Sequence, residues 1–124
     1  FEEKLPTVLA EIQRLELLFI DGDHRYQPTI AHLSACLPLA TNASVFIIAD
    51  IHWSAEMERA WEEIRNWPEI ATSIDTYHFG LLFFKEELQG APALSLIKTR
   101  FKPWRPRTQN ADSLRKQSNG NWKL

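Results

Sequence analysis

Leu17-Leu18-Phe19-Ile20-Asp21-Gly22-Asp23-His24-Arg25-Tyr26 is a run of large apolar residues that ends abruptly in ionisable ones. Two carboxylates and an imidazole follow the apolar run within four positions. The segment Leu15 to Ile20 is too short for an amphipathic helix and lacks the alternation of a half-exposed strand. We therefore predict a strand that is covered on both faces and that carries polar residues at its carboxyl end.

A second copy of this arrangement follows about one helix later. Ser44-Val45-Phe46-Ile47-Ile48-Ala49 is again continuously apolar, and Asp50-Ile51-His52-Trp53 is its polar end. We expect the two runs to be neighbouring parallel strands, about 4.8 Å apart. Ligands of such sheets bind outside the carboxyl ends of the strands. Asp21 and Asp50 could therefore share a cation or a ligand hydroxyl.

Helical patterns flank these two runs. Residues 2–13 carry apolar side chains at the spacing of one helical face, and a second helix is expected from about Tyr26 to Leu37. Ser54 is well placed as the N-cap of a third helix. That helix has an apolar stripe that predicts core packing: Met57, Ala60, Trp61, Ile64 and Trp67.

The region after the third helix predicts an inserted strand. Residues 72–77 mix polar and apolar positions as an edge strand does, whereas residues 81–84 are continuously apolar, as in a central strand. The junction His78 to Gly80 is short enough only for a tight reversal. We therefore expect the last strand to run antiparallel between the second strand and the outer edge. Residues 88–97 are expected to form a loop or a short helix, and the whole is an α/β domain with right-handed crossovers.

The composition is typical of a soluble globular chain with one domain. The chain has 124 residues, of which 44% are hydrophobic and 24% charged, with a net charge of −2. No apolar stretch approaches the roughly 18 residues of a membrane span, and no leader pattern is visible, so a cytoplasmic setting is expected. Cys36, the single cysteine, agrees with a reducing compartment.

Charge divides the chain into two parts. Residues 1–97 hold 6 Lys and Arg against 15 Asp and Glu, whereas residues 98–124 hold 8 against the single Asp112. We interpret 1–97 as the folded part and 98–124 as a basic, flexible tail, because such a segment cannot bury enough apolar area to offset ordering. Nucleic-acid binding by the tail, where Trp104 and Trp122 lie among cations, is the less favoured alternative.

With both strand-end motifs identified, the chain resembles the C-terminal half of class I S-adenosylmethionine-dependent methyltransferases, in particular bacterial members. The resemblance lies in Asp21-Gly22-Asp23-His24-Arg25-Tyr26 and in Ala49-Asp50-Ile51-His52-Trp53-Ser54-Ala55-Glu56-Met57, and it continues to Ala60, Trp61 and Ile64. It covers roughly residues 1–87. It implies a partial Rossmann-like sheet with flanking helices, made of strands 4 and 5 and the antiparallel pair 6/7 of that fold, with the N-terminal half absent.

The elements with which this family chiefly binds its cofactor have no counterpart in the chain. Those elements are a glycine-rich loop after the first strand and an acid that ends the second, but the chain has no G-x-G and its four glycines are isolated. We therefore expect a truncated half, or a half that a partner chain completes, which is inactive alone. The strand Leu15 to Ile20 would then expose an apolar edge and promote association with a partner or with a second copy.

The resemblance also implies roles for the polar strand ends. In metal-dependent O-methyltransferases, acids at the positions of Asp21 and Asp50 hold a divalent cation such as magnesium, which orients substrate hydroxyls, and a histidine at the position of His24 acts as a base. Ala49 and Ile51 depart from the pattern of many relatives, which have a second acid and an asparagine there. Asp21 and His24 are thus the expected catalytic residues.

Binding roles follow in the same way. Asp21 and Gly22 are expected to face S-adenosylmethionine, whereas Asp50, His52 and Trp53 are expected to face a small-molecule methyl acceptor. Packing at the start of the third helix is an equally good interpretation of His52 and Trp53.

Two classes of function remain open from the sequence. One is methyl transfer, most simply O-methyl transfer to a small molecule, in which the protein positions an acceptor and removes its proton. The other is a non-catalytic α/β interaction module that pairs with another chain. Metal-dependent hydrolysis is a third alternative.

Overall fold

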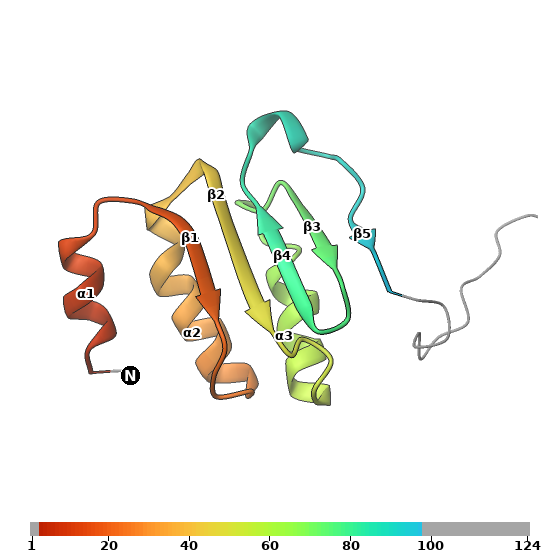
Figure 1. Cartoon of the computed structure of the whole chain (residues 1–124), viewed down its shortest axis with the longest axis horizontal. Coiled ribbons are helices and arrows are strands. Elements are labelled where there is room, and N and C mark those ends of the chain that lie inside the picture. Colours follow the sequence, from red (N-terminus) through yellow and green to blue (C-terminus); the bar gives the residue numbers. More distant parts are fainter. Residues whose placement is uncertain (1–2, 98–124) are drawn as a thin grey trace, which may run out of the picture.

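Residues 3–97 form a mixed sheet of five strands with helices packed along it (Figure 1). The computed structural model describes residues 3–97, so the predicted basic tail at 98–124 lies outside the described residues. The helices and strands in chain order are α1 Leu5–Glu11, β1 Leu15–Ile20, α2 Tyr26–Cys36, β2 Ala40–Ala49, α3 Ala55–Ile64, β3 Thr72–Asp75, β4 Phe79–Phe83 and β5 Leu94–Ser95. Two short 3-10 helices, η1 Leu37–Leu39 and η2 Glu86–Leu88, complete the set. The predicted α/β class is confirmed.

The order of the strands in the sheet is β1-β2-β4-β3-β5. β1 and β2 are parallel, whereas β4 runs antiparallel to both of its neighbours, β2 and β3. The prediction that the last long strand is inserted beside the second strand is therefore confirmed. Residues 88–97, expected as a loop or short helix, also contribute β5, which pairs with β3. The prediction of an edge strand at residues 72–77 is therefore wrong, because β3 lies between β4 and β5.

Helices α2 and α3 cover one face of the sheet, lying behind the strands in the view of Figure 1. Phe46 and Ile48 of β2 and Leu82 of β4 are fully buried on that side. Burying each such side chain contributes about 1.5–3 kcal/mol. The helices add these buried residues to the same core: Leu33, Cys36, Met57, Ala60, Trp61 and Ile64. None of the described helices is long and apolar enough to cross a membrane.

Helix α3 begins as the sequence predicted. Ser54 is extended, and its side-chain oxygen accepts a hydrogen bond of 3.2 Å from the backbone N–H of Met57. Glu56 and Glu58 occupy the first turn, where the helix dipole favours negative charge. Four residues of the predicted stripe are buried, and Trp67 packs partly buried against the same core.

Strand β1 differs from the prediction of a strand covered on both faces. Leu17 and Phe19 are 65% and 54% exposed. Their neighbours on the same face of β2, Val45 and Ile47, are only half-buried. The reason is that, among residues 3–97, no helix covers this face and no strand pairs with the outer side of β1. The expected exposed apolar edge is therefore present in the described part of the chain.

Candidate functional site

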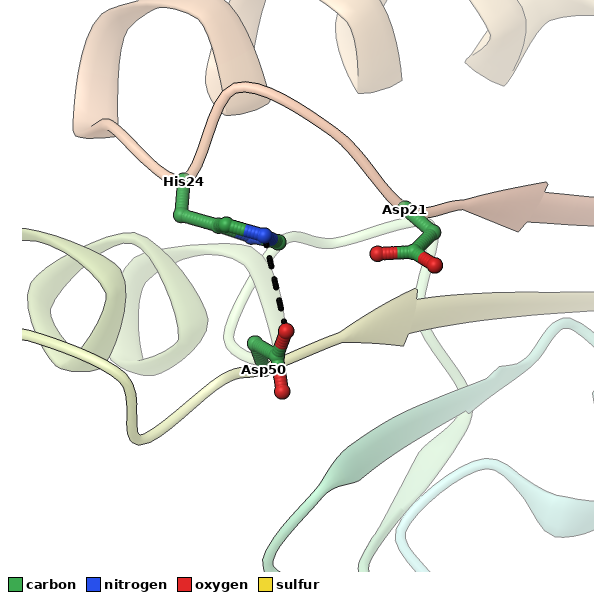
Figure 2. Close-up of side chains that lie close together, drawn as sticks. All are labelled: Asp21, His24 and Asp50. Atoms are coloured by element: carbon green, nitrogen blue, oxygen red, sulfur yellow. Dashed lines mark ion pairs between the residues drawn. The ribbon is translucent and has the colours of Figure 1, made fainter.

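Asp21 and Asp50 follow neighbouring parallel strands at the same edge of the sheet, which we call the rim. Ile20 at the end of β1 pairs with Ile48 near the end of β2, so the residues that follow emerge side by side. Figure 2 shows Asp21, His24 and Asp50 turned toward one another. One ligand atom of each lies within 4.8 Å of the other two. The structure thus brings together the three polar side chains that the sequence predicted at the rim.

His24 and Asp50 approach each other within this cluster. Nε2 of His24 lies 3.4 Å from Oδ2 of Asp50, and both side chains are about one-third exposed. This distance is longer than a usual N–H···O hydrogen bond, so the contact leaves the pair open to a ligand. The side chain of Asp21, the third member of the cluster, is exposed. The imidazole of His24 therefore lies beside the carboxylate of Asp50, and solvent still reaches both.

The backbone at the rim contains the three non-glycine residues of the described chain with positive φ. These residues are Asp23 (φ 44°), Asp50 (φ 55°) and Tyr77 (φ 79°). Aspartate tolerates the left-handed region better than most residues, whereas a bulky tyrosine there is strained. Strained residues of this kind cluster at functional sites because the surrounding structure must hold them in place.

The conformation of Asp50 is held by two backbone hydrogen bonds. Its N–H donates to the carbonyl of His78 in the β3–β4 hairpin at 2.6 Å, and its carbonyl accepts from the N–H of Trp53 at 2.9 Å. The hairpin and the start of α3 therefore both contact the backbone that carries the carboxylate.

Asp23 belongs to the turn rather than to the cluster. Both of its carboxylate oxygens accept from Arg25, from Nε at 2.6 Å and from Nη2 at 2.7 Å. This hydrogen bonding lowers the pKa of Asp23 below its ordinary value. The carboxylate is thereby committed to Arg25, which leaves Asp21 and Asp50 as the two acids of the rim.

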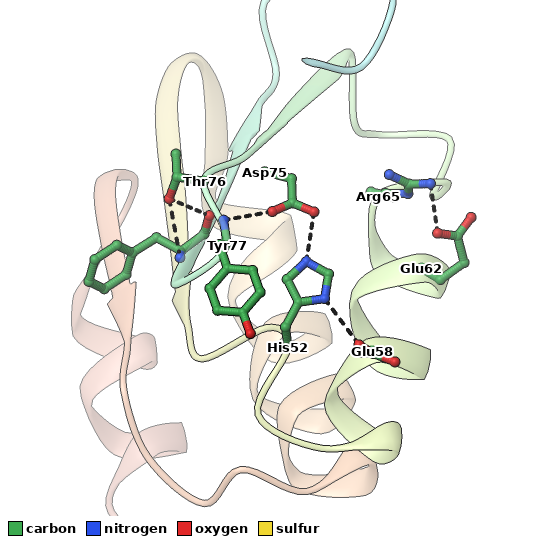
Figure 3. Close-up of polar contacts among 8 residues, drawn as sticks. His52, Glu58, Glu62, Arg65, Asp75, Thr76 and Tyr77 are labelled. Carbon is green, nitrogen blue, oxygen red and sulfur yellow. Dashed lines mark hydrogen bonds and ion pairs between the residues drawn. The ribbon is translucent and has the colours of Figure 1, made fainter. Parts of the chain in front are cut away.

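Of the three residues predicted to face an acceptor, Asp50 belongs to the cluster, whereas Trp53 and His52 lie on different sides. Trp53 is 71% exposed and tilts against His24, with ring centroids 5.9 Å apart, so it forms an apolar wall beside the cluster. His52 points inward instead, and its side chain is only 9% exposed. It contacts Asp75 and Glu58, as Figure 3 shows. The structure therefore brings Trp53 to the cluster but not His52.

Gly22 and Asp21 line one part of an open groove of about 640 Å³ beside β1. A Cβ built on Gly22 would meet nothing within 4 Å. The groove continues between β1 and the two helices α1 and α2, lined by Leu5, Leu18, Ile20, His32 and Cys36. Burial raises the pKa of the Cys36 thiol, so that side chain stays a neutral, apolar part of the wall.

Two carboxylates and one imidazole are a donor set suited to a divalent cation. Carboxylates suit Mg²⁺ and Mn²⁺, and an imidazole favours Mn²⁺ or a later transition metal. Adjacent ligand atoms of an octahedral cation with bonds of about 2.1 Å lie about 3 Å apart, whereas the three atoms here lie within 4.8 Å of one another, so the cluster would have to close around it. The exposed Asp21 side chain has room for that movement. If His24 served as a ligand, it could not also accept a proton from a substrate.

Comparisons of the chain with protein-family models, with curated proteins and with solved structures find no match. The resemblance of the two strand-end motifs to methyltransferases therefore stays a prediction. Any function has to be argued from the geometry of the rim and from the chemistry of its side chains.

Sequence reasoning missed three residues that surround His52. Asp75 and Glu58 contact its two ring nitrogens, and the ring of Tyr77 stacks on it at 5.4 Å. Nothing in the local pattern marks them, because Asp75 lies in a strand of mixed polarity and Glu58 on an ordinary charged helix face.

Proposed function

We propose that this chain forms the acceptor side of a methyltransferase active site, which transfers a methyl group from S-adenosylmethionine to a hydroxyl of a small molecule. The observation that supports this most is the meeting of Asp21, His24 and Asp50 at the carboxyl ends of two parallel strands. Sheets of this kind bind their ligands at that position.

The residues of the rim have separate tasks in this proposal. Asp21 and Asp50 would hold a divalent cation such as magnesium, and thereby the acceptor hydroxyl. His24 takes the hydroxyl proton as the oxygen attacks the methyl group, and the nearby carboxylate of Asp50 stabilises the imidazolium that results. Trp53 offers its exposed face to an apolar part of the acceptor. S-adenosylmethionine, when bound, supplies a methyl group that its sulfonium already activates.

The fit of the cofactor to this chain is only partial. Asp21 and Gly22 lie beside an open groove, but the chain has no G-x-G with which a backbone loop could approach the cofactor. We therefore propose that another polypeptide segment binds most of S-adenosylmethionine, and that this chain alone does not transfer methyl groups. Calorimetry with S-adenosylmethionine should give no binding heat with the purified chain. A clear signal would contradict the proposal that another polypeptide segment binds most of the cofactor.

The acceptor side can be tested on the chain itself by amide NMR. Adding Mg²⁺ and then catechol, as a probe with two adjacent hydroxyls, should shift the resonances of residues 21–24 and 50–53. Asp21→Asn and Asp50→Asn should abolish these shifts. Glu69→Gln, an exposed acid before β3 at the opposite end of the sheet, is the control and should not change them. The proposal fails if the rim does not respond, or if all three variants respond alike.

Methyl transfer itself is measured on the assembly that a tag on this chain isolates from its source. With methyl-labelled S-adenosylmethionine and a set of small hydroxyl compounds, His24→Gln should lower the transfer rate at least about 10²-fold, the usual minimum for losing a general base. Glu69→Gln should leave the rate unchanged. Equal rates for His24→Gln and the unmodified chain would exclude His24 as the base.

A second candidate function is that of an interaction module, favoured by the uncovered face and edge of β1. Leu17 and Phe19 are exposed, and within residues 3–97 no strand pairs with the outer edge of β1, a combination that promotes strand pairing between chains. Leu17→Lys should then dissociate any dimer, measured by analytical ultracentrifugation. Leu96→Lys is the matched control, because Leu96 is equally exposed, at 65%, but lies after β5. A monomer whose rim binds no ligand would argue against both functions.

A further inference from the structure

His52 lies two residues after Asp50, and its ring lies among Asp75, Glu58 and Tyr77 (Figure 3). Its Nε2 contacts Oδ2 of Asp75 at 2.8 Å, and its Nδ1 contacts Oε1 of Glu58 at 3.3 Å. The side chains of His52 and Asp75 are 9% and 7% exposed. These contacts connect the β2–α3 loop with the end of β3 and with α3.

Asp75 also holds the hairpin that follows β3. Its Oδ1 accepts a hydrogen bond of 2.8 Å from the backbone N–H of Tyr77. Tyr77 has the strained φ of 79°, and its ring stacks on His52 with an interplanar angle of 21°. A bulky residue keeps such a conformation only when its surroundings hold it there, and Asp75 and His52 provide those contacts.

The residue after Tyr77 connects this cluster to the rim. The carbonyl of His78 accepts the N–H of Asp50, so the position of that carbonyl depends on how Tyr77 turns the chain. On the other side of Asp50, His52 is itself fixed to Asp75. The left-handed backbone of Asp50 is therefore held at two points. Its own N–H is bonded to His78, and His52, two residues later, is bonded to Asp75.

We propose that His52 and Asp75 form a positioning pair that fixes the backbone of Asp50, and thereby aims its carboxylate at His24 and Asp21. The proposal rests on the proposed function only for the identity of the ligand that Asp21, His24 and Asp50 bind. It gives His52 a task other than contact with an acceptor: the ring contacts Asp75, Glu58 and Tyr77, and it acts on the rim through the backbone.

The first test needs no ligand. In amide NMR spectra of the full chain, Asp75→Asn should shift the Asp50 resonance, because one amide oxygen cannot replace both carboxylate oxygens. His52→Ala should shift it too. Glu62→Gln is the control, since it removes an exposed ion pair at α3 in which Oε2 of Glu62 lies 2.7 Å from Nη2 of Arg65. An Asp50 resonance that is unchanged in folded Asp75→Asn would overturn the proposal.

The second test measures Mn²⁺ affinity by electron paramagnetic resonance at a temperature where each variant is folded. Loss of a residue that orients a ligand costs about 10–100-fold in metal affinity, so we expect a loss of about 10-fold for His52→Ala and less for Asp75→Asn. Full affinity in a folded His52→Ala protein with a lowered unfolding temperature would reveal a purely structural role and contradict the proposal. If the unmodified chain binds no Mn²⁺, the proposed function fails, whereas the Asp50 resonance still decides the positioning.

Discussion

Gly80 lies directly against the indole ring of Trp61: a Cβ built on Gly80 would come 2.4 Å from Cζ3 and 2.6 Å from Cη2. Trp61 is buried in the core between α3 and the sheet, so its ring has little room to move. We predict that Gly80→Ala lowers the free energy of unfolding by about 1–3 kcal/mol, the usual cost of overpacking, as measured by urea denaturation. Gly22→Ala is the control and should stay within about 0.5 kcal/mol, because its Cβ would meet open space. Equal losses for the two substitutions would contradict the close contact.

The N-cap of α3 gives a second prediction. Ser54→Ala removes the acceptor for the Met57 N–H and should lower the free energy of unfolding by about 1 kcal/mol. Ser54→Asp keeps an acceptor at the cap and should retain most of the stability. Thermal denaturation followed by circular dichroism compares the three proteins. If aspartate were as damaging as alanine, the hydrogen bond would not be the source of the effect.

The hydrogen bonds in the turn after β1 lead to a prediction for the pKa of Asp23. Because the hydrogen bond from Arg25 lowers its pKa, the carboxyl should titrate below 3.8 in ¹³C NMR. A pKa that is lower in the folded state stabilises the fold above the unfolded value, and this contribution is lost as the pH falls through the folded pKa. Arg25→Gln should move the titration midpoint back toward 3.8. Arg14→Gln, whose ion pair with Glu16 lies at the far end of β1, should not.

The rate at which a thiol reagent modifies Cys36 should report on unfolding. Its side chain is buried, and burial raises the pKa of the thiol, so a thiol reagent should modify the native chain slowly. With a folded pKa above the ordinary 9.0, the thiol stabilises the fold below that pH, and this contribution is lost as the pH rises through the folded value. Modification at pH 8 should accelerate with urea in parallel with unfolding. Rapid modification without urea would show that α2 opens locally.

Most of the fold could be predicted because its signals are local. The apolar runs, the Ser54 cap and the α3 stripe each depend on a few neighbouring residues, and the apolarity of residues 81–84 revealed the strand order. The uncovered face of β1 could not be predicted. A continuous apolar run shows that both faces favour burial, but it carries no information on which segment buries them.

The candidate site divides in the same way. Asp21 and Asp50 could be predicted to meet, because two parallel strands place their ends at one edge of the sheet. The direction of the His52 side chain could not be predicted, because it depends on Asp75, which comes from another strand. A contact that is distant in sequence and made by an ordinary acid leaves no local pattern.

The positive φ angles of Asp23, Asp50 and Tyr77 have a cost in stability, although these residues supply the backbone and side chains of the rim. Glycine would adopt these angles without strain. The gain is largest at Tyr77, where relief of a strained bulky residue is worth about 1–3 kcal/mol before the entropy that glycine costs, and it is smaller at the two aspartates, which tolerate the left-handed region. A laboratory selection for heat resistance alone should therefore accumulate glycine at these three positions. Variants that survive such a selection would be more stable proteins that lack the side chains of Asp23, Asp50 and Tyr77 at the rim.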